Sequence, residues 1–132
     1  MAENQALKIL QDYDCLCMKS PRTMRRIFIR GKGMLYVSQA NDFFGLFDIV
    51  AKSKSTITLW IQVKSTTQHV SAAKKDIEKF YKKYCSGSET VEIWLKVPRK
   101  GFCIYYIDPI NNRWEKRYIN LKGEKVDKFK IS

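Results

Sequence analysis

The stretch that most constrains the fold is residues 47–65, FDIVAKSKSTITLWIQVKS. Its apolar residues come in two short runs separated by the polar segment 52–55, a pattern typical of two β-strands joined by a short connection. Because successive side chains of a strand face opposite sides, Gln62 and Lys64 share one face of the second strand. The opposite face carries Ile57, Leu59, Ile61 and Val63.

Three polar residues of this stretch converge if the two strands form a hairpin. Asp48 stands at the head of the first strand, and Gln62 and Lys64 stand near the tail of the second. An acid, a second oxygen donor and a lysine in one place suit metal-assisted hydrolysis of a phosphodiester. A lysine also commonly reaches solvent from a strand end, and a glutamine can cap a sheet edge. Spacing alone therefore leaves a catalytic and a purely structural role open.

The charge of the chain indicates a polyanionic partner. Its 132 residues include 25 Lys+Arg and 13 Asp+Glu, a formal net charge of +12. Such an excess costs self-repulsion and is typical of proteins that bind nucleic acid, with an anionic membrane surface as the second option. A basic protein without such a partner would have the same composition.

The N-terminal residues and the cysteines indicate a cytoplasmic, intracellular protein. The first ten residues lack a basic region followed by an apolar run, so we expect no signal peptide. No apolar run approaches the ~20 residues of a membrane span, so we expect no membrane partner. A zinc site would require all four cysteines, or three with His69, and Cys15-x-Cys17 lacks the spacing of a metal knuckle. We expect reduced thiols and no small-molecule cofactor.

The remaining chain alternates helical and strand patterns. We predict helices at residues 2–11 and 72–84, and the second helix is expected to bury Ala73, Ile77, Phe80, Tyr81 and Tyr84. Further strands are predicted at residues 15–19, 26–30, 34–38, 91–97, 101–107 and 113–119. The lysine-rich tail could form an edge strand, a dimer contact or a loose basic arm. Without a repeat or a long linker, this order predicts a single domain over residues 1–132, an α/β sandwich around a mixed sheet.

A basic segment, residues 22–43, lies between the first strand and the central pair. Gly31-Lys32-Gly33 indicates a turn, so we predict an inserted two-stranded hairpin. Its cationic residues are Arg22, Arg25, Arg26, Arg30 and Lys32. Because the arginine fork matches phosphate geometry, we expect these residues to contact DNA. The alternative is a solvated hairpin whose charge only aids solubility.

Four short segments follow one another along the chain. They are an acid in the first helix, Glu3, a strand that ends in Lys19-Ser20, the run Asp48-Ile49-Val50-Ala51, and the run Ile61-Gln62-Val63-Lys64. In this order the chain resembles the PD-(D/E)xK nuclease superfamily and, within it, the archaeal-type Holliday junction resolvases. The resemblance covers the first two-thirds of the chain well and the last third only as a strand pattern. It implies a restriction-endonuclease-like fold, with a mixed central sheet flanked by two helices.

The resemblance also implies roles at a metal site. Asp48 would be the principal ligand of Mg²⁺ or Mn²⁺, and Gln62 would bind through its side-chain oxygen beside the Val63 backbone carbonyl. Glu3 would complete the site directly or through a water. For Glu3 the alternative is an ordinary first-turn acid that the helix dipole favours.

The other implied roles concern water and substrate. Lys64 would position or activate the attacking water and offset charge at the phosphate. Lys19 and Ser20 would contact DNA, and Ser20 could instead touch a metal-bound water.

Two features depart from the family pattern. The segment between residues 21 and 44 is longer than the compact loop typical of the resolvases and could serve a particular substrate. Gln62 stands where the motif usually has its second acid. An amide oxygen can bind Mg²⁺ but carries no charge, so the metal affinity should be lower. The superfamily tolerates glutamine here, so this change does not by itself imply an inactive protein.

We therefore expect a metal-dependent endonuclease that acts on branched DNA in recombination and repair. The resemblance implies a homodimer, because symmetric cuts across a junction need two sites. One alternative is a nuclease of the same fold that cuts or nicks duplex DNA in repair or restriction. A second is a nucleic-acid-binding protein of this fold with little or no hydrolysis, and a third is a basic RNA-binding protein of another fold.

Overall fold

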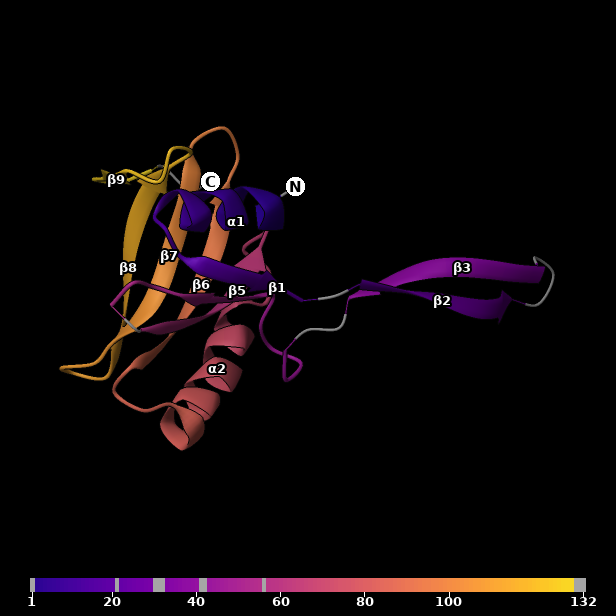
Figure 1. Ribbon diagram of the computed structural model, residues 1–132, viewed down its shortest axis with the longest axis horizontal. Helices are drawn as coiled ribbons and strands as arrows, with labels where there is room; N and C mark the ends of the chain where they lie inside the picture. Colours follow the sequence, from indigo (N-terminus) through magenta and orange to yellow (C-terminus); the bar gives the residue numbers. More distant parts are fainter. Residues whose placement is uncertain (1, 21, 30–32, 41–42, 56, 130–132) are drawn as a thin grey trace.

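The computed structural model, which describes residues 2–20, 22–29, 33–40, 43–55 and 57–129, contains a seven-stranded mixed sheet with helices on both faces (Figure 1). The helices are α1 (Ala2–Asp12) and α2 (Val70–Tyr84). In spatial order the strands are β1 (Leu16–Lys19), β4 (Ile49–Lys52), β5 (Thr58–Lys64), β6 (Glu89–Val97), β7 (Gly101–Asp108), β8 (Arg113–Asn120) and β9 (Lys125–Val126). Strands β5 and β6 are parallel, and the other neighbours are antiparallel. The predicted α/β class with a mixed sheet is confirmed.

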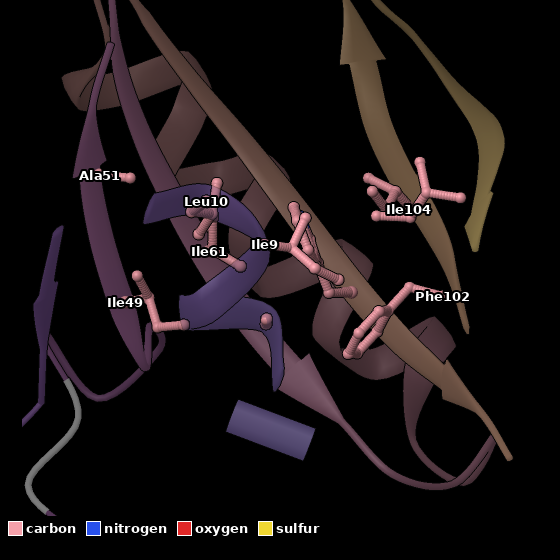
Figure 2. Close-up of a cluster of buried hydrophobic side chains, with 10 residues drawn as sticks. Ile9, Leu10, Ile49, Ala51, Ile61, Phe102 and Ile104 are labelled. Carbon is pink, nitrogen blue, oxygen red and sulfur yellow. The ribbon is translucent and has the colours of Figure 1, made fainter. Parts of the chain in front are cut away.

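Helix α1 covers one face of the sheet through an apolar stripe. Ala6, Ile9 and Leu10 lie at helical spacing and are buried. They pack against Ile49 and Ile61 of the central strands (Figure 2). Burying an isoleucine side chain contributes about 1.5–3 kcal/mol, so this contact anchors α1 over β4 and β5.

Helix α2 covers the opposite face. Ala73 and Ile77 are buried in a cluster with Phe47, and Phe80 packs against the same cluster. The prediction that Tyr84 is buried was wrong, because this side chain is 64% exposed. Tyr84 ends the helix, and its ring contacts Phe80 at the surface, with ring centroids 5.4 Å apart.

Strands β4 and β5 form the central hairpin that the sequence predicted. They pair antiparallel with Ile49 opposite Ile61. Leu59 and Val63 pack on the α1 side of the sheet, whereas Trp60 packs on the α2 side. Side chains alternate along a strand, so the residues after Trp60 at even positions also face the α2 side.

This alternation decides the direction of the predicted site residues on β5. Gln62 and Lys64 share the face of Trp60, as predicted. Ile57, which was predicted to extend the apolar face, precedes β5 and is 37% exposed.

The basic segment forms a separate two-stranded sheet, β2 (Arg22–Ile29) and β3 (Gly33–Ala40). The strands pair from Arg22↔Ala40 to Ile29↔Gly33, so the hairpin is confirmed and is longer than predicted. It is inserted between β1 and β4, which are themselves neighbours, and it extends away from the main sheet (Figure 1). Arg30 and Lys32 lie outside the described residues.

The C-terminal residues close over α1. The Tyr13 hydroxyl donates to the Gly123 carbonyl at 2.7 Å. Gly123 has a φ of +87°, and a Cβ there would lie 2.8 Å from side-chain atoms of Ile9 and Tyr13. Only glycine suits this position, because a side chain would force the turn away from the helix. Beyond it, β9 pairs with β8, so part of the lysine-rich tail is an edge strand.

The four cysteines are free thiols. Within the described ranges, neither helix combines the length and the hydropathy that a membrane crossing requires.

Candidate functional site

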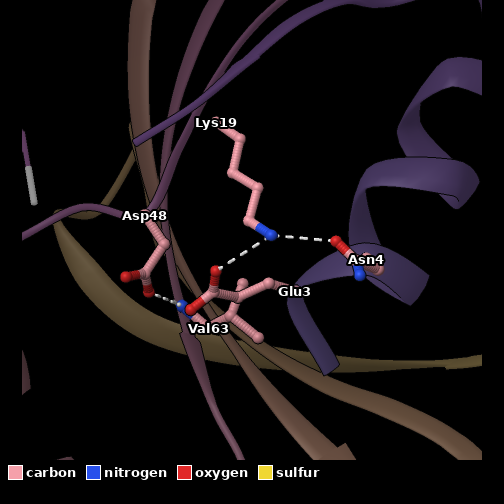
Figure 3. Close-up of polar contacts among 5 residues, drawn as sticks. All are labelled: Glu3, Asn4, Lys19, Asp48 and Val63. Atoms are coloured by element: carbon pink, nitrogen blue, oxygen red, sulfur yellow. Dashed lines mark hydrogen bonds and ion pairs between the residues drawn. The ribbon is translucent and has the colours of Figure 1, made fainter. Parts of the chain in front are cut away.

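A buried carboxylate stands where the pairing of β4 with β5 ends. Asp48 is 8% exposed and immediately precedes β4. Its backbone amide donates to the Ile61 carbonyl at 2.8 Å. The Val63 amide donates to the Asp48 Oδ2 atom at 2.7 Å (Figure 3). A side-chain oxygen thus satisfies a strand amide, and this bond fixes the carboxylate against β5.

Gln62 lies on β5 at the position opposite Asp48. The two residues that flank Gln62 in the chain, Ile61 and Val63, both form hydrogen bonds with Asp48. The Gln62 Oε1 atom is buried and has no hydrogen-bond partner among the described residues. An unsatisfied buried amide oxygen costs about 1–3 kcal/mol. Such a group is rare in a folded interior and indicates a ligand, an ion or a water.

Lys64 ends β5 on the same face as Gln62. At ~3.3 Å per residue, the two positions lie ~7 Å apart along the strand. The Lys64 side chain is partly buried and forms no ion pair with another described residue. Asp48, which precedes β4, thus lies opposite Gln62 of β5, and Lys64 lies two residues beyond Gln62 on the same strand.

Glu3 reaches the same end of the sheet from α1. It lies in the first turn, where the helix dipole favours an acid. The Lys19 Nζ atom lies 3.6 Å from Glu3 Oε2 and donates to Asn4 Oδ1 at 2.9 Å. In Figure 3 the Glu3 carboxylate faces Lys19, and the Asp48 carboxylate faces the Val63 amide. Helix α1 packs on the face of the sheet opposite Trp60, so Glu3 approaches β5 from the face opposite Gln62.

Lys19 and Ser20, the predicted DNA contacts of β1, are engaged within the protein. Lys19 is held by α1 as described above. Ser20 is 5% exposed, and its amide donates to the Asp48 carbonyl at 2.8 Å. Its backbone therefore fixes the Asp48 position. Of the hairpin arginines, Arg22, Arg25 and Arg26 lie on β2, a strand that extends away from the main sheet (Figure 1).

The donor atoms around Asp48 suit a hard divalent cation. The described ranges contain no cluster of three or more His, Cys, Asp or Glu side chains arranged for a metal. They do contain the Asp48 carboxylate, which accepts from the Val63 amide, and the Gln62 oxygen, which has no partner there. Oxygen donors are those that Mg²⁺ and Mn²⁺ prefer. This set carries less charge than two acids, and Lys19 partly balances Glu3, so it fits a weakly held cation.

Sequence reasoning missed an aromatic cluster on the α2 side of β5. The ring centroids of Phe44 and Phe47 lie 5.6 Å from that of Trp60, and the Phe80 centroid lies 5.7 Å from it. The strand alternation contained a signal for Trp60, because it shares the face of Gln62. Phe44 comes from a turn, which periodicity does not place.

No protein-family model, no curated protein and no solved structure matches the chain.

Proposed function

We propose that this chain is a Mg²⁺- or Mn²⁺-dependent DNA endonuclease that cleaves branched DNA as a homodimer. The observation that carries the proposal is the buried Asp48 carboxylate, held at 2.7 Å by the Val63 amide, together with the buried oxygen of the adjacent Gln62, which has no partner among the described residues. Lys64 follows on the same face of the strand. A carboxylate, an amide oxygen and a lysine in this order are the parts that metal-assisted phosphodiester hydrolysis needs.

The element order supports a restriction-endonuclease-like fold. Helix α1 is followed by the antiparallel strands β1, β4 and β5, then by α2, and then by β6 parallel to β5. Asp48 precedes the middle strand of the three, and Gln62 and Lys64 lie on the third. This is the arrangement that the resemblance to the PD-(D/E)xK superfamily implies.

In the proposed site each residue has a separate task. Asp48, Gln62 and the Val63 carbonyl would hold the divalent cation, and Glu3 would complete the set. When bound, the cation would supply charge stabilisation at the phosphate. Lys64 orients the attacking water and offsets negative charge at the phosphate. The water oxygen bonds to phosphorus as the bond to the leaving strand oxygen breaks, one water proton is released to solvent, and the leaving oxygen takes up a proton from solvent.

The charge of the chain supports DNA as the substrate. The net charge of +12 favours a polyanion, and five cationic residues lie on or between the hairpin strands. A branched substrate and a homodimer follow from the resemblance to junction resolvases, because paired cuts need two sites.

A DNA-binding protein of this fold with little or no hydrolysis is the second candidate function. Gln62 is neutral where the motif usually has an acid, and Lys19 lies 3.6 Å from the Glu3 carboxylate. Both features lower the negative charge available to a metal.

The two candidates differ in a cleavage assay. We expect the purified chain to cut a four-way DNA junction in Mg²⁺ or Mn²⁺ and not in chelator, with less cutting of nicked and linear duplexes. Lys64→Ala should lower the cleavage rate at least ~100-fold, the lower range for a general acid–base or positioning group, and leave junction affinity nearly unchanged.

The matched control is Lys122→Ala, which removes the same charge at an exposed turn and should cut normally. Metal-dependent cleavage that survives Lys64→Ala would refute the role of Lys64. Junction binding without cleavage in either metal would favour the second candidate.

A further inference from the structure

We propose that the groove between β5 and α2 binds an unpaired nucleotide of the DNA, with its base stacked on aromatic rings and its phosphate held by lysines. The inference rests on the proposed function, because it names the part of a branched substrate that this face of the protein recognises. Branch points expose nucleotides whose bases are free to leave the helical stack.

The groove is large and its floor is aromatic. It has a volume of about 1060 Å³ and is lined by Phe44, Leu46, Trp60, Phe80 and Tyr84, among others. The Phe44 ring lies 5.6 Å from both the Trp60 and the Phe80 rings, measured between centroids. These spacings are those of packed aromatic side chains, so the rings form a continuous surface.

Two rings of this surface face water. Phe44 is 72% exposed and Tyr84 is 64% exposed. Large apolar side chains that gather in the open typically mark a binding surface. Aromatic faces accept any nucleobase, because every base presents a π-face for stacking.

The turn that carries Phe44 holds it in an unusual conformation. Phe44 has a φ of +54°, which bulky L-residues rarely adopt. The turn is closed by the Phe43 amide, which donates to the Phe47 carbonyl at 2.8 Å. The backbone thus keeps an exposed phenyl ring against Phe80 although this conformation is unfavourable.

The charges around the groove are complementary to a nucleotide. Lys79, Lys82 and Lys83 line it, together with the acids Asp76 and Glu89. Glu89 is already engaged, because the Trp60 indole and the Ser86 amide donate to its two oxygens at 3.3 Å and 3.1 Å. Three lysines thus line the groove against two acids, and one of these lysines, Lys82, also lies 3.9 Å from Glu78 Oε2 on the same helix. The net charge of the whole chain is +12. This balance favours a nucleic acid strand over an apolar peptide.

The groove also adjoins the proposed cleavage site. Trp60 lies two residues before Gln62 on the same face of β5, a distance of ~7 Å along the strand. Phe47, which packs behind the groove, is the residue before Asp48. A base stacked at Phe44 would therefore leave its neighbouring phosphates within reach of the Asp48 and Gln62 positions.

The test measures binding of a fluorescent oligo-dT strand and of a duplex of equal length, by anisotropy at one fixed salt concentration. Phe44→Ala should raise the Kd for oligo-dT about tenfold, in the range that the loss of one stacked base produces. The Kd for the duplex should change less than twofold. Phe44→Gly, which suits the positive φ, should show the same loss if the ring and not the backbone matters.

The matched control is Ile110→Ala, because Ile110 is 92% exposed in the turn between β7 and β8. It should leave both affinities unchanged. Oligo-dT should also quench tryptophan emission, and Trp60→Phe should remove most of this quenching. Unchanged oligo-dT affinity in both Phe44 variants would overturn the groove proposal, as would a groove that binds an apolar peptide and not oligo-dT.

The two proposals fail separately in these experiments. If oligo-dT binding depends on Phe44 but no DNA is cut in Mg²⁺ or Mn²⁺, the groove proposal stands and the nuclease proposal falls. If the junction is cut and Phe44→Ala binds oligo-dT normally, only the groove proposal falls.

Discussion

At the scale of single residues, Asp48 and Gln62 make opposite contributions to the fold. The Asp48 carboxylate satisfies the Val63 amide at 2.7 Å and so stabilises the end of the central hairpin. Gln62 buries an oxygen that no described residue satisfies, which costs about 1–3 kcal/mol. Residues that lower stability in this way are typical of functional sites, where the group meets its partner only in the complex.

Gln62→Glu tests whether this oxygen faces a metal. The second carboxylate next to Asp48 should lower the midpoint of thermal unfolding in chelator, because like charges repel and burial disfavours the charged form. Mg²⁺ should raise the midpoint more in Gln62→Glu than in the original chain, because ligand binding to the folded state stabilises it. Thermal unfolding at increasing Mg²⁺ concentrations measures both effects. Junction cleavage at low Mg²⁺ should be kept or increased.

Thr90→Val is the matched control, because the Thr90 Oγ1 atom is the second buried side-chain atom with no partner among the described residues. Removing that hydroxyl should raise the unfolding free energy by about 1 kcal/mol and should not change its response to Mg²⁺. An equal response to Mg²⁺ in Gln62→Glu and in the original chain would show that position 62 does not face a metal.

At the scale of secondary-structure elements, the crossover from β5 through α2 to β6 is closed by Glu89. This first residue of β6 accepts hydrogen bonds from the Ser86 amide after α2 and from the Trp60 indole on β5. The Ser86 amide is the main cause that lowers the pKa of Glu89, followed by the Trp60 hydrogen bond. One carboxylate thus connects three elements next to the aromatic groove.

Because its pKa is lowered, Glu89 should make the stability of this crossover depend on pH. Its pKa is lower in the folded state, so its stabilisation is present above the ordinary glutamate value of about 4.3 and is lost as the pH falls through the folded pKa. Urea unfolding at pH 6 and pH 3.5 measures the loss. In Glu89→Gln the loss between these two pH values should be smaller.

Glu124→Gln is the matched control for this comparison, because Glu124 is an exposed acid near the other end of the chain. This variant should lose as much unfolding free energy between the two pH values as the original chain. If Glu89→Gln also loses as much as the original chain, the Glu89 carboxylate does not stabilise the crossover.

At the scale of the whole molecule, the hairpin of β2 and β3 is an arm attached to the open seven-stranded sheet (Figure 1). Strands β1 and β4 pair with each other on either side of the insertion, so the main sheet does not depend on the arm for its pairing. The arm has no acidic residue between positions 22 and 40, and its cations lie at 22, 25, 26, 30 and 32. The molecule therefore separates a structural sheet from a positively charged extension.

Replacing residues 23–39 by a short glycine linker should leave the fold intact and weaken DNA binding. Arg22 and Ala40 are opposed at the base of the arm, so a short linker can join them. The slope of log K against log salt should become shallower by about one unit for each phosphate that the arm no longer neutralises. Anisotropy at several salt concentrations and circular dichroism measure the two effects.

The control keeps the arm and replaces by glutamine the four cations that the linker removes, at positions 25, 26, 30 and 32, which should lower the salt slope to a similar degree. A linker variant that binds a DNA junction as tightly as the original chain would contradict a DNA-binding role for the arm. A variant that fails to fold would contradict the independence of the main sheet.

Much of the fold was predictable because its signals are local. The helical stripe of Ala6, Ile9 and Leu10 and the alternation around Gln62 depend only on residues close together in the chain. The same holds for the inserted hairpin, whose turn residues lie between its strands. The burial of Tyr84 was wrongly predicted, because helical spacing shows which side of a helix a residue lies on. It does not show how far the neighbouring elements that cover this side extend along the helix.

The sequence predicted that Asp48 and Gln62 come close together, but not the contacts that hold them there. In the structure Asp48 lies opposite Gln62 because it forms hydrogen bonds with Ile61 and Val63. That Lys19 pairs with Glu3 depends on how α1 lies over β1. The position of Phe44 depends on a turn with positive φ, which residue patterns do not reveal.

The sequence by itself determined the elements of the central hairpin, the faces of β5 and the excess of positive charge. These follow from alternation, turn residues and composition, which neighbouring residues carry. Only the tertiary structure decided that the Val63 amide holds the Asp48 carboxylate, that the Gln62 oxygen is buried without a described partner, and that Phe44 joins Trp60 and Phe80. The physical reason is that these contacts join segments distant in the chain, whose distances and directions are set by the packing of both helices on the sheet.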